Sequence, residues 1–341
     1  MIRIIVSFLL FFLIIVYDVK GDAWELLKLA DEKIKQGSCD EAIKDLTAAL
    51  EFDGSLFEAY FKRGICKFRL GDSEGALNDL DASIAYKKDY IPAYLEKATV
   101  LEARKEYKEA LKVLDRAFLI KPDDHSIFGK RGVIRFNNQE YEEAIKDFDA
   151  AIKLNNQVYD WYLYRGLAYD YSGNLITAID DYSKAIEINP KDTRAYFNRA
   201  NARNMLGHYP EALADIDKTI SLNPTDQEAY LVRAHVELSM GNYSSALEDC
   251  DEVIKLGLNN FDLHLTKAIA LYHLNKIREA ISELDQAIVL DNTKGIAYLY
   301  RGEYKHKLKD PGACADIQMA NKLGEKEAEE VTKKICKKNK L

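Results

Sequence analysis

Three histidines late in the chain are the side chains of this sequence most suited to hold a metal ion. His235, His273 and His306 fall on roughly the same face of successive expected helices, which is one requirement of a zinc site. We favour the simpler interpretation that they are exposed side chains at unrelated heights. The sequence has no Gly-rich phosphate loop, no His-Glu-x-x-His, no nucleophile elbow and no closely spaced cysteine pair. We therefore expect a protein that is not an enzyme and binds no metal and no cofactor.

The residues that set the architecture recur every 34 positions. Residues 193–226 read as two amphipathic helices, joined at Gly207 and closed by Pro224, since Gly permits the positive φ of a tight turn and Pro ends a helix. With Thr193 as position 1, position 8 is always small and position 20 is always Ala. Small residues at facing positions let two helices approach closely, and a period in this range indicates stacked helix pairs.

This pattern resembles the tetratricopeptide repeat (TPR), whose motif has an aromatic residue at position 4, small residues at positions 8, 20 and 27, and Pro at position 32. The resemblance implies an all-α fold, an α-solenoid in which helix-turn-helix units form a right-handed superhelix. We expect nine repeats within residues 22–324, and a capping helix with a basic tail over 325–341. The expected repeats start at residues 23, 57, 91, 125, 159, 193, 227, 261 and 295.

Two charged positions repeat with the same period. Position 7 is basic in eight successive units, and position 23 is acidic in every unit except the one with Val113. We expect each acid to pair with the base of the following unit, as in Asp181 with Arg199, which would leave Arg131 without an acid. The alternative is two separate, solvated stripes of charge. Partly buried pairs of this kind mainly fix the register of the units.

The family resemblance also implies a ligand groove on the concave side, lined by positions 2, 5, 9 and 12 of each first helix. In this sequence that lining is largely apolar and aromatic, which suits an extended peptide or an amphipathic helix. The alternative is that such residues only pack between neighbouring helices, and we expect this of about half of them. The candidate protein-binding residues are Phe61, Ile65, Phe68, Val133, Phe136, Leu163, Leu167, Phe197, Asn201, Asn204, Leu231, Leu265 and Tyr272.

Residues 1–21 lie outside the repeat pattern and resemble a secretory signal peptide. Arg3 precedes an apolar run over residues 4–17, which is shorter than the roughly 20 residues that cross a bilayer. We expect export to a bacterial periplasm or envelope, to the extracellular space, or to the secretory pathway lumen, with no membrane span in the mature chain. An uncleaved anchor is the alternative. The net charge of −8 has the wrong sign for binding a nucleic acid backbone.

The resemblance and the expected export together predict a non-catalytic scaffold that binds a peptide or helical segment of a protein partner. The alternative is a secretory-pathway or envelope co-chaperone that holds unfolded clients. Neither the His-Pro-Asp of a J-domain nor the carboxylate clamp of cytosolic TPR co-chaperones is present, since Phe197 stands where that clamp needs Lys before Asn201. The pattern specifies neither the partner nor the oligomeric state.

Five cysteines in an exported chain cannot all pair internally. Cys314 stands at position 21, which faces the next helix, and for the last repeat that helix is the cap carrying Cys336. The two sulfurs could therefore approach within disulfide range. Cys39 and Cys66 have a related geometry and form a second possible bridge. The alternative is that all five are small apolar core residues, as we expect for Cys250.

Overall fold

The computed structural model describes residues 21–336, and every regular element among them is an α-helix. The expected signal peptide, apart from its last residue, lies outside the described residues. No helix in the described range is long and apolar enough to cross a membrane. The chain divides into two compact units, with the boundary in the sequence between Ser172 and Gly173.

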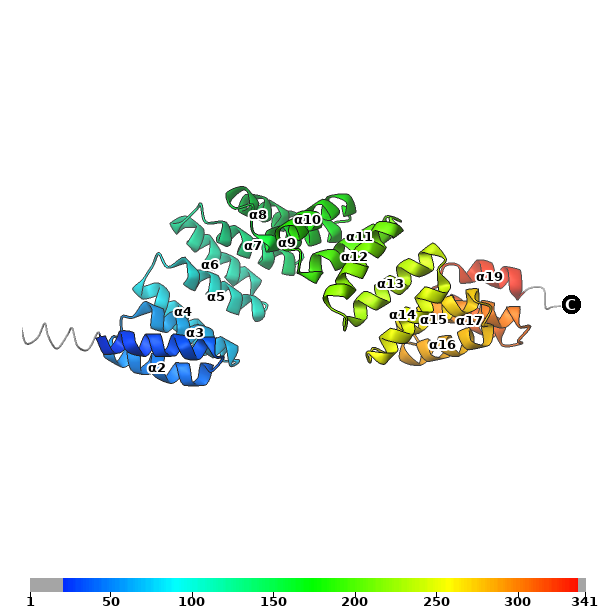
Figure 1. Ribbon diagram of the computed structural model, residues 1–341, viewed down its shortest axis with the longest axis horizontal. Helices are drawn as coiled ribbons and strands as arrows, with labels where there is room; N and C mark the ends of the chain where they lie inside the picture. Colours follow the sequence, from blue (N-terminus) through cyan, green and yellow to red (C-terminus); the bar gives the residue numbers. More distant parts are fainter. Residues whose placement is uncertain (1–20, 337–341) are drawn as a thin grey trace, which may run out of the picture. The chain divides into compact units, whose positions relative to one another are not determined.

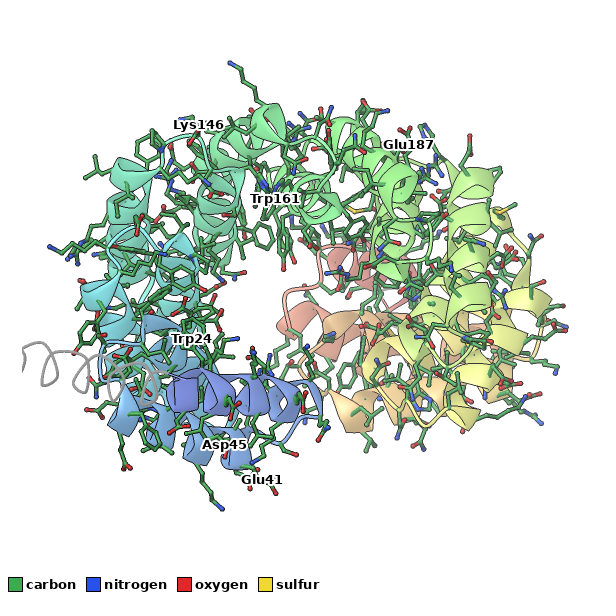
Figure 2. All side chains as sticks on the ribbon, turned by 60° about the vertical axis from the view of Figure 1, so that its left-hand side comes forward. Trp24, Glu41, Asp45, Lys146, Trp161 and Glu187 are labelled. Atoms are coloured by element: carbon green, nitrogen blue, oxygen red, sulfur yellow. A yellow bond between two sulfur atoms is a disulfide. The ribbon has the colours of Figure 1, made fainter. Side chains whose placement is uncertain are left out.

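Unit 1 consists of helix pairs that pack against each other in sequence order (Figure 1). Its first helix covers residues 21–35 of the described range. The helices that follow are α2 (Cys39–Phe52), α3 (Phe57–Arg69), α4 (Ser73–Tyr86), α5 (Ile91–Ala103), α6 (Tyr107–Ile120), α7 (His125–Asn137), α8 (Tyr141–Leu154) and α9 (Tyr159–Tyr171). Trp161 lies on the inner side of this unit, on α9, whereas Lys146 projects from the outer side of α8 (Figure 2).

Unit 2 repeats the same arrangement and ends with a short additional helix. Its helices are α10 (Leu175–Ile188), α11 (Thr193–Met205), α12 (Tyr209–Leu222), α13 (Gln227–Met240), α14 (Tyr243–Lys255), α15 (Phe261–His273), α16 (Ile277–Leu290), α17 (Gly295–Lys307), α18 (Ala313–Lys322) and α19 (Ala328–Ile335). The all-α repeat fold is confirmed. Odd-numbered helices from α3 to α17 begin 34 residues apart, while the division into nine repeats and a cap stays a prediction.

Small residues are required where the two helices of a pair cross. The position-20 alanines are buried in every unit. At position 8, a Cβ added to Gly64 would lie 3.1 Å from Leu80 Cγ and 3.2 Å from the carbonyl oxygen of Ala76. Close approach of the helices at these two positions leaves the larger side chains to fill the space beside them.

The turn between the helices of a pair has the same left-handed conformation with and without glycine. Gly207 has a φ of 77°, and the residues at the same position in other units, Lys105, Gln139, Asn275 and Lys309, have φ values of 56–65°. A side chain in this conformation costs about 1–2 kcal/mol per residue. These four turns therefore keep the shared geometry at the expense of stability.

We expect Gln139→Gly to raise the free energy of unfolding by about 0.5–1 kcal/mol, because relief of backbone strain exceeds the added entropy of the unfolded chain. Gln139 is exposed, so its side chain contributes little packing. Gly207→Ala should lower the same free energy by a similar amount. Urea denaturation measures both, and equal signs for the two variants would contradict the explanation.

The two charged positions form a ladder of ion pairs whose register differs from the expected one. The position-7 base pairs with the position-23 acid of its own unit, across a single helix pair. The pairs are Arg63 with Asp79, Arg131 with Asp147, Arg199 with Asp215, Arg233 with Asp249 and Arg301 with Asp316. The expectation of pairing with the following unit is wrong, because the two helices of one pair bring these positions face to face.

The same bases also contact position 25 of the preceding unit. This position is an exposed acid for Arg131, Arg233 and Arg301, and a hydroxyl residue, Thr47 or Ser183, for Arg63 and Arg199. Arg131 reaches Asp115 at 3.3 Å as well as Asp147 at 2.6 Å, so the expectation that it lacks an acid is also wrong. Lys97 is the base in the unit of Val113, and among residues 21–336 its one ion pair is with Asp81 of the preceding unit, at 2.5 Å. Lys97 is therefore the base whose loss should lower stability least.

Candidate functional site

A cavity of about 1200 Å³ lies in unit 2 between the first helices of the last two pairs and the terminal helix. Helix α15 contributes Ile269, Tyr272 and His273 to its lining. The other lining residues are Tyr300, Glu303, Tyr304, His306, Lys307 and Lys309 from α17 and the turn after it, and Glu327, Glu330, Val331, Lys334 and Ile335 from α19 and its N-cap. Three helices thus enclose a site with apolar, aromatic and charged walls.

Stacked aromatic rings form one wall of this cavity. The rings of Tyr272 and Tyr304 are nearly parallel with centroids 4.0 Å apart, and Tyr300 lies 6.0 Å from Tyr304. The Lys307 ammonium sits 5.1 Å from the centre of the Tyr272 ring. Burial raises the pKa of Tyr304, so its phenol stays protonated at neutral pH and keeps an O–H to donate. Such a wall offers ring faces and hydrogen-bond donors together.

The charges along the cavity have both signs. Glu303 is half-buried, and its burial, together with the negative charge of Glu327, raises the pKa of its carboxyl. The positive charge of Lys334 on α19 lowers the pKa of the same carboxyl. Basic residues gather in the last turn of α17 and acidic ones in the first turn of α19, the ends at which the helix dipole favours them.

We expect Glu303→Gln to raise the melting temperature at pH 7 and to leave it unchanged near pH 3. A raised pKa means that the folded state holds the proton more tightly than the unfolded state. The stability cost is therefore absent at low pH and appears as the pH rises through the folded pKa. Thermal melts of both proteins between pH 3 and pH 8 measure this, and parallel curves would refute it.

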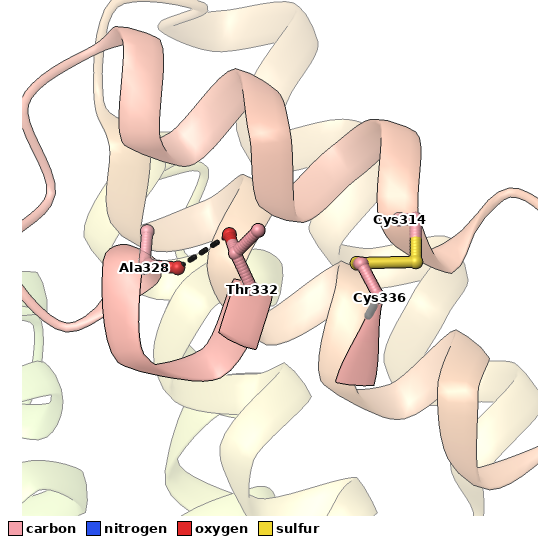
Figure 3. The surroundings of a disulfide bond; sticks show 4 residues. All are labelled: Cys314, Ala328, Thr332 and Cys336. Carbon is pink, nitrogen blue, oxygen red and sulfur yellow. Dashed lines mark hydrogen bonds between the residues drawn. A yellow bond between two sulfur atoms is a disulfide. The ribbon is translucent and has the colours of Figure 1, made fainter. Parts of the chain in front are cut away.

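A disulfide bond fixes the helix that forms the third wall. Cys314 at the start of α18 is bonded to Cys336 at the end of α19, with their Cα atoms 5.5 Å apart (Figure 3). Within α19 the Thr332 hydroxyl donates to the carbonyl oxygen of Ala328 at 2.7 Å, as Figure 3 shows. Ala328 is buried in a cluster with Leu299, so both ends of the helix are held against the last pair.

The second possible disulfide is not formed. Cys39 and Cys66 are both free and buried. Burial and a hydrogen bond with Cys39 raise the pKa of Cys66 to about 12, so the Cys66 thiol stays protonated in the core of unit 1. Cys250 is likewise a free, buried thiol.

Two of the thirteen candidate groove residues are core residues, which corrects the expectation for them. Leu163 is 2% exposed and Leu231 is 4% exposed, because position 5 faces the neighbouring helix in these units. A ligand on the surface cannot reach either side chain. The other candidates, such as Ile65, Val133 and Leu167, are half-buried.

Five of the eleven half-buried candidates also pack against a core cluster, and Tyr272 is one of them. Phe61 and Phe68 pack against the core around Leu80, and Phe197 packs against the cluster of Ile216. Leu265 joins the cluster of Leu284. Asn201 and Asn204 are half-buried on α11.

Phe136 belongs to an aromatic cluster in unit 1. Its ring centroid lies 5.6–5.9 Å from those of Tyr141, Tyr164 and Tyr171. Tyr171 is 65% exposed, so the cluster reaches the surface.

Tyr272 is the candidate that lies in the cavity. The position rule that selected it also points to Glu303 and His306, at positions 9 and 12 of the last pair, so a signal for both existed in the sequence. Tyr300 and Tyr304 were missed because positions 6 and 10 face a neighbouring pair in other units. Here they face the cavity that α19 closes, and the 34-residue pattern does not specify the placement of that helix.

The three late histidines lie in different surroundings. His235 lies 2.7 Å from the Thr266 hydroxyl, and burial lowers the pKa of its imidazole. His273 stacks on Tyr243 with ring centroids 4.3 Å apart. His273 and His306 line the cavity and His235 does not. Among the described residues, no three potential ligands are placed to hold one metal ion.

The repeated helix pairs and the cavity beside their first helices define a helical-repeat protein. Residues 27–89, 125–158, 159–192 and 182–214 match family models of the tetratricopeptide repeat. These regions of the chain therefore contain tetratricopeptide repeats, and such repeats indicate a protein–protein interaction scaffold. Residues 205–287 also match the model of anaphase-promoting complex, cyclosome, subunit 3. No curated protein sequence matches the chain.

Solved structures share the fold at low sequence identity. A tetratricopeptide repeat protein from Parabacteroides merdae ATCC 43184 is 21% identical over 73% of this chain and 98% of its own, with a TM-score of 0.52. The Pseudomonas aeruginosa protein pilF is 16% identical over 62% and 96%, with a TM-score of 0.55. The APC/C hetero-tetramer Cut9-Hcn1 is 13% identical over 92% and 76%, with a TM-score of 0.57. At sequence identities this low, the structural similarity shows that the fold is shared and nothing more.

Proposed function

We propose that the cavity between α15, α17 and α19 is part of a groove that binds a peptide or helical segment of a protein partner. The observation that carries this proposal is the cavity itself, about 1200 Å³ with stacked tyrosines on one wall and charges of both signs along it. Concave sites with aromatic area and a few placed polar groups are the usual form of a binding site. Aromatic side chains are also enriched among the few interface residues that supply most of the binding free energy.

Within unit 2 the segment would also contact the first helices beside the cavity, where the half-buried candidates Asn201 and Asn204 leave part of each side chain accessible. Ring faces of Tyr272 and Tyr300 would take its apolar side chains. Glu303 and Lys307 would orient its polar groups. The helices of the site pack against their neighbours, so little ordering of these helices is required on binding.

We further propose that the scaffold acts after export, with cleavage near Gly21. Arg3 and the apolar run over residues 4–17 support this, together with a repeat pattern that begins directly afterwards. N-terminal sequencing of the protein isolated from its source tests it. A mature chain that begins near residue 22 is the expected result, and an intact Met1 would overturn it.

Selection from a random twelve-residue peptide library against the chain from residue 22 tests the groove. We expect selected peptides to bind Tyr300→Ala and Glu330→Lys at least tenfold more weakly than the parent protein. Lys146→Ala, on the outer side of α8, is the matched control and should bind unchanged. Melting temperatures show whether each variant is folded. Equal affinity for all four proteins would mean that the peptides bind elsewhere.

A further inference from the structure

The ladder of ion pairs is interrupted at one place in unit 1. Val113 stands where Asp147 and its counterparts accept hydrogen bonds from two bases, and it is 8% exposed. Leu101 likewise replaces the second of these bases, which is Arg135 in the next pair. Lys97 therefore keeps only one acidic partner, Asp81, whose side chain is 58% exposed. The Lys97 ammonium therefore lacks a buried acidic partner such as Asp147, which Arg131 has.

A cavity of about 560 Å³ lies at this interruption, between α4, α5 and α6. Three of its lining residues are basic, Lys88, Lys97 and Arg116, and Asp81 is the one acidic residue among them. Neither Lys88 nor Arg116 forms an ion pair within residues 21–336. The cavity is thus locally positive on a chain of net charge −8. An anionic group entering it would gain charge-assisted contacts with few competing carboxylates.

The rest of the cavity is apolar and partly uncovered. Val113 belongs to a buried core cluster, and Ile84 packs against that cluster. On α6, Leu119 is 82% exposed and Ile120 is 41% exposed, and both line the cavity. The Tyr94 hydroxyl donates to the carbonyl oxygen of Lys88 at 2.9 Å, which fixes the turn beside it. Exposed apolar side chains next to unpaired bases indicate a contact surface for something both apolar and acidic.

We propose that this cavity binds an acidic segment of a protein partner, with a carboxylate against Lys97 and Arg116 and an apolar side chain against Val113 and Leu119. The carboxylate replaces the acid that the ladder lacks at position 23. A protein segment fits better than a nucleic acid backbone, because the exposed Leu119 and Ile120 require an apolar side chain beside the carboxylate. The site shares no residue with the cavity in unit 2, so the scaffold has two contact surfaces.

Fluorescence anisotropy with labelled peptides tests this on the chain from residue 22. The probes are Leu-Asp-Leu-Asp-Leu-Asp and its uncharged counterpart Leu-Asn-Leu-Asn-Leu-Asn. We expect the Asp peptide to bind at least tenfold more tightly than the Asn peptide, and the difference to shrink as salt is raised. Equal binding of the two peptides would overturn the proposal.

Two variants and a control place the binding at this cavity. Val113→Asp restores the missing acid beside Lys97, so it should weaken the Asp peptide at least tenfold without lowering the melting temperature. Arg116→Gln changes an exposed side chain and should weaken binding about threefold to tenfold in a protein that melts like the parent. Lys112→Gln, on the exposed side of α6, should change nothing.

Undiminished binding to both Val113→Asp and Arg116→Gln would overturn the proposal. So would stronger binding to vesicles of phosphatidylcholine with phosphatidylserine than to the Asp peptide, because the ligand would then be a lipid surface. The Tyr300→Ala variant should bind the Asp peptide normally. Failure of the groove in unit 2 would therefore be distinguishable from failure here.

Discussion

Replacing Asp147 by Asn is expected to lower the free energy of unfolding by about 3 kcal/mol. The Asp147 side chain is 3% exposed and accepts hydrogen bonds from Arg131 at 2.6 Å and from Arg135 at 2.7 Å. Removing its charge leaves two largely buried guanidinium groups without their main partner. An uncompensated buried charge costs far more than a surface pair contributes.

Asp149→Asn is the matched control for this prediction. Asp149 pairs with Arg165 at 2.5 Å, but its side chain is 53% exposed, so its loss should cost less than about 1 kcal/mol. Urea denaturation followed by circular dichroism compares the two variants. Equal losses would mean that the ladder does not depend on burial.

Replacing Gly132 by Ala is expected to cost about 1–3 kcal/mol through overpacking. A Cβ at Gly132 would lie 2.7 Å from a ring carbon of Phe148, which is fully buried. The pairs with Ala at position 8 have a smaller residue than Phe opposite, as in Ala98 with Leu114. The two aromatic residues at position 24, Phe148 and Tyr182, both belong to pairs with Gly at position 8.

The double variant Gly132→Ala with Phe148→Leu should restore part of the lost stability. Leu is shorter than Phe and leaves room for the added methyl group, as it does in the pair of Ala98 and Leu114. We expect a favourable coupling energy of about 1 kcal/mol or more in a double-mutant cycle. Additive losses would show that the two positions do not compete for the same space.

Much of the fold follows from the repeat pattern, because position 8, position 20 and the turn residue each have one structural role in every unit. The turns at Lys105 and Gln139 show that this geometry persists even without glycine. The register of the ion pairs could not be derived from the pattern. Positions 7 and 23 fit a partner in the same unit or the next, and only the packing of Arg131 on Asp147 distinguishes the two.

The candidate site was less predictable for a related reason. Leu163 and Phe197 both stand at position 5 of their units, yet Leu163 is buried whereas Phe197 is half-buried. Whether a residue at this position faces a groove depends on the size of its neighbours. The cavity beside Tyr300 depends on α19, which is not a repeat, so no periodic rule specifies its lining.

Hydrogen–deuterium exchange of the chain with and without a saturating selected peptide tests the central claim most directly. Binding in the groove should slow exchange in α15, α17 and α19, since the peptide would hold these three helices together. Exchange in α8, on whose outer side Lys146 lies, should not change. Protection confined to second helices such as α8 or α16, with none in α15, α17 and α19, would contradict a ligand groove at this cavity.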